Sequence, residues 1–327
     1  MATERSGRTD RSPLRLDLVL LNRVERLSDT QFVYLMLVPV FVLLGSMAIW
    51  PLIDTFGMSL RADNIISSDA TGEFVGLENY AKMLTGQANA ILPRPFLDLS
   101  APFTSAVSVT LIFTAVAVAF ETVLGFGMAL VLDKDFAGRR WIRVAIILPW
   151  AVPIVIQGMI FYLIFTPGVG FAVAPLQSLE LISGSPLADS QSSLIIVILS
   201  DIWKQAAFMA LLILAGLQSI NRDLYNVAKV TGATKLQEFM TITFPLVLPT
   251  LLIALLFRTI AALKVYGTVV TITNCNTLPT LTCLVITTWN ANRYASAATI
   301  AFIMAAVIGI ALLAYLFKLR DLEYGGI

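Results

Sequence analysis

The sequence contains no histidine, and charged residues make up only 13% of its 327 positions. Without histidine the chain lacks the commonest metal ligand and the usual general base at neutral pH. It also lacks a Gly-x-x-x-x-Gly-Lys-Ser/Thr phosphate loop, so we do not expect it to hydrolyse ATP by itself. These absences argue against a catalytic residue set, a metal site and an enzymatic role. Nothing in the sequence suggests nucleic-acid binding.

Apolar residues are abundant: they make up 57% of the chain, and the mean hydropathy is +0.83. Crossing about 30 Å of hydrocarbon takes roughly 20 helical residues. Six apolar runs are long enough: Phe32–Leu52, Thr104–Leu132, Val144–Phe165, Leu194–Leu217, Leu246–Thr268 and Tyr294–Phe317. The sequence therefore predicts an all-α, polytopic membrane protein with six transmembrane helices. Prolines inside these runs predict kinks rather than loops, because membrane helices tolerate proline; they are Pro149, Pro153 and Pro249.

Most of the basic residues lie in the N-terminal tail, in segments 134–143 and 222–235, and in the C-terminal tail. Lys and Arg close to membrane helices stay preferentially on the cytoplasmic side. We therefore predict a multi-pass protein of the plasma membrane with both termini cytoplasmic. The expected parts are a basic tail (1–31), a transmembrane domain (32–320) with an extracytoplasmic loop (54–103) that forms a small cap, and a C-terminal tail (321–327). We expect the first apolar run to remain as an anchor, because no cleavage site follows it.

Residues 221–245 form a polar loop between the fourth and fifth apolar runs. Asn221 or Asp223 can cap a short helix that Gly232 would end. Thr234 and Gln237 have the spacing of a capping box, so a second helix should follow at once. A rigid helix-turn-helix projection suits insertion into a groove on another protein. An amphipathic connector lying on lipid headgroups is the alternative interpretation.

Within this loop, Asn226-Val227-Ala228, Gly232, Ile242 and Phe244-Pro245 have the spacing of a Glu-Ala-Ala, Gly, Ile-x-Leu-Pro pattern. The segment resembles the coupling loop of the permease subunits of ABC importers, although Asn226 stands at the Glu position and Phe244 at the Leu position. We call residues 221–245 the coupling loop. The resemblance implies that the loop docks on an ATPase. The residues expected to take part are Leu224, Asn226, Val227, Ala228, Gly232, Ala233, Phe239, Ile242 and Pro245.

Three further parts of the chain resemble the carbohydrate-importer branch of that family, which includes maltose and glycerol-3-phosphate permeases; they are 74–80, 148–153, and 203–204 together with 215–220. The resemblance implies a type I importer permease fold and transport of a sugar. It also implies several partners: ABC ATPase subunits, a second and similar permease subunit, an extracytoplasmic solute-binding protein and membrane lipid. The partner ATPase would use ATP and Mg, and this chain would hold no cofactor.

Five ionisable residues lie within or at the ends of the apolar runs, where an unpaired charge is costly; they are Glu121, Asp201, Lys204, Arg258 and Lys264. Helix geometry places Asp201 and Glu121 at depths similar to that of Arg258, so we expect one of them to pair with it. The alternatives for these charges are a structural ion pair and a polar lining of the solute path. The predicted path residues are Asp201, Lys204, Arg258, Lys264 and Tyr266, and the last two are expected to lie nearest the solute.

Cys275 and Cys283 lie in the predicted outer loop between the fifth and sixth runs. A disulfide is chemically permitted there, and two free thiols are the alternative. Three glycines in the apolar runs, Gly125, Gly127 and Gly309, are expected to allow close helix contacts.

Two alternative functions stay open at this stage. The same machinery could carry glycerol phosphate, phosphate, a polyamine or another small polar solute. A protein of another class, an ATP-independent secondary transporter or channel, could also have six helices, although no inverted repeat is visible in the sequence.

Overall fold

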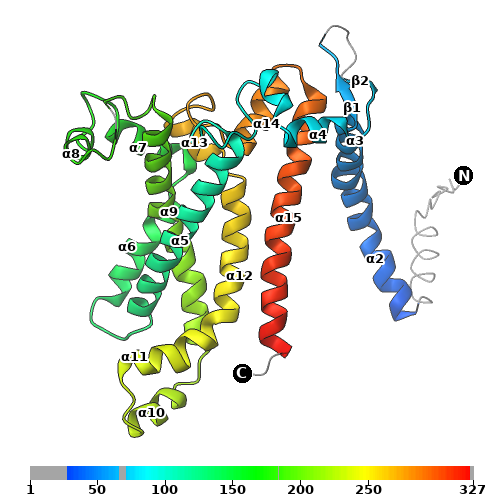
Figure 1. The fold of residues 1–327 in the computed structure, drawn as a ribbon. Helices are drawn as coiled ribbons and strands as arrows, with labels where there is room; N and C mark the ends of the chain where they lie inside the picture. The colour runs from blue at the N-terminus through cyan, green and yellow to red at the C-terminus, as the bar shows by residue number, and fades with distance from the viewer. Residues whose placement is uncertain (1–27, 66–70, 183, 325–327) are drawn as a thin grey trace, which may run out of the picture. The chain divides into compact units, whose positions relative to one another are not determined.

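The computed structural model describes residues 28–65, 71–182 and 184–324, which form a mainly helical protein (Figure 1). The chain divides into two compact units, Met1–Gly57 and Met58–Ile327. Among the described residues, five helices are long and apolar enough to cross a membrane, and one sharply bent helix pair brings the number up to six. Most of the predicted N-terminal tail, residues 1–27, lies outside the described residues.

The first unit is one long apolar helix, made of α2 (Asp29–Leu44), a π-helical turn η1 (Gly45–Ile49) and α3 (Trp50–Ser59), whose last residues enter the second unit. Ser28 and Gln31 form a capping box at its start, and none of the α2 residues is buried. The helix continues beyond the predicted end at Leu52, so the prediction that a loop begins at residue 54 is wrong. The Thr55 hydroxyl bonds the Pro51 carbonyl at 2.7 Å, which lets this polar residue stay helical.

A small folded cap begins the second unit. Its antiparallel strands β1 (Arg61–Asp63) and β2 (Thr71–Phe74) are followed by α4 (Glu78–Leu84) and the 3₁₀ turn η2 (Gln87–Ala90). The Asp63 carboxylate accepts hydrogen bonds from the backbone N–H of Ser296 at 2.9 Å and from its hydroxyl at 2.7 Å. Buried Met83 and Phe96 belong to the same apolar cluster as Leu284. These contacts attach the cap to the two helices that end the chain, α14 (Leu281–Asn290) and α15 (Tyr294–Tyr324).

Three long helices pack against one another in the second unit: α5 (Ala106–Leu132), α9 (Ser190–Gln218) and α12 (Phe244–Leu263). In Figure 1 they run between the cap at one end and the coupling loop at the other, with the C-terminal part of α15 at the coupling-loop end. Pro249 lies inside α12 without ending it, as predicted. Gly125 lets α5 approach α9 closely, because an added Cβ would lie 2.6 Å from Met209 Cβ. A Cβ built on Gly127 or Gly309 would meet no atom of another element within 4 Å among the described residues, so neither glycine makes a close helix contact within this chain and that part of the prediction is wrong.

The third predicted span is broken into α6 (Arg139–Ala151) and α7 (Ile154–Ile164), which meet at 92°. The prediction of one kinked helix is therefore wrong. Pro149 is accommodated within α6, whereas Val152 before Pro153 has the extended backbone that proline imposes on its predecessor. We call the junction at Val152 and Pro153 the elbow.

The fifth predicted span ends earlier than expected, at Leu263 instead of Thr268. Lys264 is the C-cap of α12, and the chain then starts α13 (Gly267–Ile272). A Cβ on Gly267 would lie 2.7 Å from Ile154 Cδ1, so α7 packs directly on the first turn of α13. The remaining short helices of the second unit are α8 (Val173–Ser178), α10 (Asp223–Val230), α11 (Lys235–Glu238) and the π-helical turn η3 (Phe239–Thr243).

Candidate functional site

The coupling loop folds as the predicted helix-turn-helix. After α10, Gly232 has φ +78°, a left-handed conformation that favours glycine. The backbone N–H of Ala233 bonds the Ala228 carbonyl at 2.9 Å, and that of Gly232 bonds the Lys229 carbonyl at 3.1 Å, which together form a Schellman turn. At the start of α10, the Asn221 carboxamide accepts a hydrogen bond from the N–H of Asp223 at 2.9 Å.

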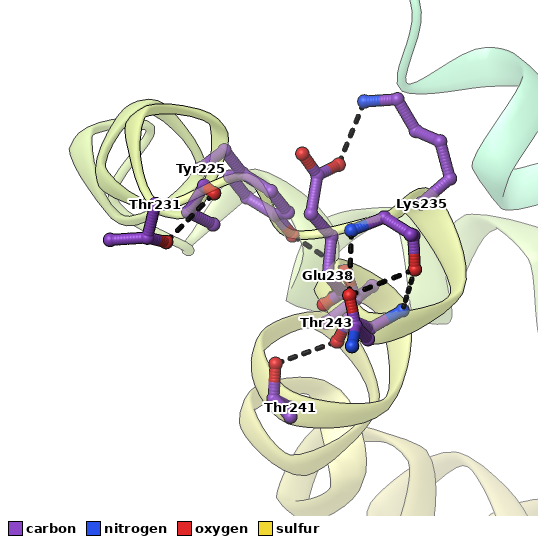
Figure 2. Close-up of polar contacts among 9 residues, drawn as sticks. Tyr225, Thr231, Lys235, Glu238, Thr241 and Thr243 are labelled. Atoms are coloured by element: carbon purple, nitrogen blue, oxygen red, sulfur yellow. Dashed lines mark hydrogen bonds and ion pairs between the residues drawn. The ribbon is translucent and has the colours of Figure 1, made fainter.

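The second helix, α11, begins with the predicted capping box. Thr234 Oγ1 accepts from the Gln237 N–H at 3.4 Å, and the Gln237 side chain accepts from the Thr234 N–H at 2.8 Å. Thr241 continues the pattern by bonding the Gln237 carbonyl at 2.6 Å (Figure 2). Because α11, η3 and α12 follow without a break, the turn at Gly232 is attached rigidly to a membrane-spanning helix.

Side-chain contacts fix the base of the coupling loop (Figure 2). The Tyr225 hydroxyl of α10 lies 2.9 Å from Thr243 Oγ1 of η3. Lys235 Nζ lies 2.8 Å from Glu238 Oε2, and the Glu238 side chain is buried. Phe239 packs edge-on against Phe126 of α5, with ring centroids 5.5 Å apart. The coupling loop is therefore packed against α5 as well as being continuous with α12.

A bidentate ion pair fixes the beginning of the coupling loop to the end of α5. Arg222 donates to both carboxylate oxygens of Asp133, at 2.8 and 2.6 Å. These hydrogen bonds raise the pKa of Arg222 above its usual value, so the guanidinium stays charged. Two parallel hydrogen bonds fix the orientation of the guanidinium relative to the carboxylate, so this partly exposed pair has a defined geometry.

Several large apolar side chains of the coupling loop are exposed. Val230 is 89% exposed and Leu236 is 68% exposed. Large apolar side chains gathered on a solvated projection mark a protein or membrane contact. We call the exposed large apolar side chains of α10, α11 and η3 the exposed apolar face; they are Leu224, Val227, Val230, Leu236 and Met240.

The predicted coupling residues thus fall into two groups. Leu224 and Val227 belong to the exposed face, and Asn226 is also exposed. The others shape the loop: Ala228 is buried, Gly232 and Ala233 make the turn, Phe239 and Ile242 pack inward, and Pro245 lies in the first turn of α12.

Arg258 of α12 lies in a buried charge cluster with two carboxylates. It donates to both oxygens of Glu121 on α5, with one N–O distance of 2.9 Å, and also to Asp201 on α9. All three side chains are almost fully buried. Sequence reasoning expected one carboxylate partner, and the structure has both. The cluster joins the three long helices at one level.

Lys204, one turn beyond Asp201, points to the elbow instead of joining that cluster. Its Nζ donates to the Val152 carbonyl at 2.8 Å, which is a carbonyl left free by the end of α6. Nearby, the buried Gln157 of α7 donates to Ser200 of α9, to the carbonyl at 3.0 Å and to the hydroxyl at 2.9 Å. These bonds hold both arms of the elbow on α9.

Lys264 and Tyr266 are placed apart from the charge cluster, at the turn between α12 and α13. Lys264 is exposed, and Tyr266 is partly buried against the central apolar cluster. Within the described part of the chain, no ion pair joins Lys264 to the carboxylates of the charge cluster. The role of the five predicted residues in a solute path stays a prediction.

Cys275 and Cys283 form a disulfide with a Cα–Cα distance of 5.3 Å, which ties the loop after α13 to the first turn of α14. The bond closes a short loop, with the two cysteines eight positions apart. Thr280, the N-cap of α14, lies inside this loop and bonds the Val265 carbonyl at 3.0 Å. The disulfide thus stabilises the segment between α13 and α14, which is hydrogen-bonded to Val265 just after α12.

Reducing this disulfide is expected to lower the free energy of unfolding by about 2 kcal/mol, because closing a loop of this length removes conformational entropy from the unfolded chain. The test is the thermal unfolding midpoint in detergent with and without reductant, with thiol formation followed by mass spectrometry. Cys275→Ser is the control: it breaks the bond without touching the buried sulfur of Cys283. It should unfold at the midpoint of the reduced protein and be insensitive to reductant. An unchanged midpoint in fully reduced protein would contradict the prediction.

Residues 121–320 match the family described as binding-protein-dependent transport system inner membrane component. This segment includes the charge cluster, the elbow and the whole coupling loop. The chain belongs to this family of membrane transport components, and it is therefore a multi-pass protein of the cell membrane.

Individual relatives agree with this assignment. The trehalose/maltose transport system permease protein MalF of Thermococcus litoralis is 34% identical over 240 residues, covering 73% of this chain and 76% of the relative. The trehalose transport system permease protein SugA of Mycobacterium tuberculosis is 29% identical over 248 residues, covering 76% and 75%. The solved structure of a bacterial ABC transporter involved in import of the acidic polysaccharide alginate shares the fold, with a TM-score of 0.73 and 21% identity over 93% of this chain and 99% of that chain.

Proposed function

We propose that this chain is the permease subunit of an ATP-driven importer, that it forms half of a translocation path for a sugar, and that its coupling loop docks on an ABC ATPase. The observation that carries the proposal is the coupling loop itself. Its exposed apolar face is presented on two short helices that a Schellman turn, a capping box and the Tyr225–Thr243 bond hold in one arrangement. A preformed apolar projection of this kind suits helix-in-groove docking.

The structure also supports a route by which motion could pass from the ATPase to the membrane. The loop continues into α12, is ion-paired to the end of α5 and follows directly on α9. Those three helices are joined deeper in the bundle by the Arg258 cluster. A displacement of the loop would therefore move α5, α9 and α12 together. ATP and Mg would be bound by the partner ATPase, not by this chain.

A sugar is proposed as the solute because two similar relatives, MalF and SugA, are named for trehalose/maltose and trehalose transport. Delivery by an extracytoplasmic binding protein is part of the same proposal, and the family's description as binding-protein-dependent supports it. Pairing with a second permease subunit is also proposed, on the resemblance of the coupling loop to those of ABC importers. The experiment on solute is uptake of labelled trehalose or maltose by cells with and without this chain, competed by unlabelled glycerol phosphate and polyamine. Absence of any chain-dependent uptake of the sugars, together with chain-dependent uptake of labelled glycerol phosphate or polyamine, would overturn the sugar assignment.

Docking on an ATPase is tested by recovering the tagged chain from its native membrane and identifying what comes with it. Val230→Asp and Val230→Lys are both expected to reduce ATPase recovery by about tenfold or more, because burying a valine contributes about 1.5 to 3 kcal/mol and a charge there must be desolvated. Val230 is 89% exposed, so neither change should disturb the fold.

The matched control is Leu99→Asp, another apolar-to-charged change, at a residue that is 83% exposed and lies before α5, away from the coupling loop. It should leave ATPase recovery unchanged. A chain that arrives without an ATPase and still moves solute would contradict the proposal. If both Val230 variants recover as much ATPase as the parent chain does, the exposed apolar face is not the docking surface.

A further inference from the structure

A second feature of the coupling loop lies on the side of α10 that faces the membrane helices. A pocket of about 530 Å³ opens between the end of α5, the end of α9 and the two short helices. One face of α10, including its N-cap residue, lines the pocket. Its residues recur at three- and four-residue spacing: Arg222, Tyr225, Asn226 and Lys229. Val227 and Val230 do not line it. The two faces of α10 thus have different chemistry, and only the apolar one is used in the docking proposal.

The pocket carries an excess of positive charge. Two carboxylates line it, and both are already paired: Asp133 with Arg222 and Glu238 with Lys235. Lys134 and Lys229 also line it, and within the described part of the chain neither has an acidic partner. Both lysines are exposed, so an anion entering from solvent or from the membrane surface could reach them.

The remaining lining combines hydrogen-bonding groups with an apolar floor. Tyr225 and Asn226 contribute a hydroxyl and a carboxamide, and Leu130, Leu217 and Phe239 are apolar. Leu130 and Leu217 are in the last turns of two membrane-spanning helices, so the pocket lies where the bundle meets the headgroup layer. A ligand that suits this lining has a phosphate for the two free ammonium groups and an apolar part for the floor.

We propose that this pocket binds the phosphate group of an anionic phospholipid, with Lys134 and Lys229 as its charged ligands. Basic pockets at the ends of membrane helices on the cytoplasmic side are suited to such headgroups. A bound headgroup would lie between α5 and α10, on the opposite side of α10 from the apolar docking face. The inference rests on the pocket and its charges, and it stands whether or not the loop docks on an ATPase.

The test uses the full chain in phosphatidylcholine nanodiscs with or without phosphatidylglycerol, and native mass spectrometry counts the lipid retained after mild detergent release. The double variant Lys134→Gln/Lys229→Gln is expected to retain phosphatidylglycerol roughly thirtyfold less well, since each basic residue near an anionic headgroup contributes about 1 kcal/mol. Asn226→Glu places a carboxylate in the same lining and should weaken retention by roughly fivefold, the effect of about one lost charge.

Lys318→Gln is the matched control, because Lys318 is also exposed, lies in the last turns of α15 and does not line the pocket. It should retain phosphatidylglycerol as the parent does. In phosphatidylcholine alone all variants should unfold at the parent midpoint, since the substituted side chains are exposed and unpaired. Equal phosphatidylglycerol retention by the double variant and the Lys318 control would overturn the proposal.

A second measurement distinguishes a lipid headgroup from a soluble anion as the ligand of the pocket. Inorganic phosphate, added to protein in phosphatidylcholine nanodiscs, is expected to leave the unfolding midpoint unchanged at concentrations where phosphatidylglycerol raises it. Stabilisation by inorganic phosphate alone, lost in the double variant, would overturn the lipid assignment in favour of a free phosphate.

Discussion

Replacing Arg258 with Met is expected to destabilise the helix bundle by about 3 to 5 kcal/mol, the range for breaking a buried ion pair from one side. Arg258 is 2% exposed and holds Glu121 and Asp201, which are 0% and 5% exposed. Methionine has a similar length but no charge, so the variant would leave two buried carboxylates close together without a counter-ion. The measurement is the thermal unfolding midpoint in detergent, together with the yield of monodisperse protein.

Glu121→Gln provides the matched comparison, and its expected effect is small. The cluster has two carboxylates for one guanidinium, so removing the charge of Glu121 leaves Arg258 paired with Asp201 and still able to bond the glutamine oxygen. The triple variant Glu121→Gln/Asp201→Asn/Arg258→Met carries no charge and should recover most of the stability lost in Arg258→Met. If Arg258→Met is no more harmful than Glu121→Gln, the carboxylates do not depend on the guanidinium, and the cluster is not what joins the three helices.

The parts of the fold that sequence could predict are those that depend on neighbouring residues. Gly232 needs only its own freedom at positive φ, and Thr234 and Gln237 cap a helix that starts between them. Because these signals lie within a few positions of one another, the helix-turn-helix of the coupling loop was predictable. Long apolar runs likewise identified the spans, although their ends were off by several residues.

The elbow was not predictable because its stability comes from residues distant in sequence. Lys204 of α9 supplies a donor to the Val152 carbonyl at the elbow, and Gln157 of α7 donates to Ser200 of α9. A proline in an apolar run does not decide whether the helix continues or breaks: Pro149 lies inside α6, whereas α6 ends just before Pro153. The missing information was which polar side chain of α9 would meet the free carbonyl.

For the charge cluster and the helix contacts, the sequence predicts how deep in the membrane a residue lies but not which neighbouring helix its side chain faces. Residue spacing places Glu121, Asp201 and Arg258 at comparable levels, yet the rotation of each helix about its axis decides which side chains face one another. The same limit explains why Gly125 makes a close contact and Gly127 does not, since two positions apart they face different ways. Gly158, which makes a tighter contact than Gly125, was missed for this reason.

Gly158→Val is the second change with a large expected effect, a loss of about 3 kcal/mol of stability. A Cβ built on Gly158 would lie 2.0 Å from Thr271 Oγ1 and 2.2 Å from Thr271 Cβ, far inside van der Waals contact. Overpacking of a close helix contact costs about 1 to 3 kcal/mol, occasionally more. Because α7 and α13 would have to separate, the bond between Gln157 and Ser200 beside the contact should be strained as well. The measurement is again the unfolding midpoint and the folded yield in detergent.

The cause of that loss can be isolated with two further variants. Gly127→Val makes the same chemical change in a membrane helix at a position with nothing within 4 Å, so it should leave the midpoint close to that of the parent. Gly158→Ala/Thr271→Gly moves the small residue to the other side of the contact and should be more stable than Gly158→Ala alone, because Thr271 Oγ1 and Cβ, the two atoms nearest the new Cβ, are gone. Equal damage from Gly158→Ala with and without the Thr271 change would show that the α7–α13 contact is not what requires glycine at this position.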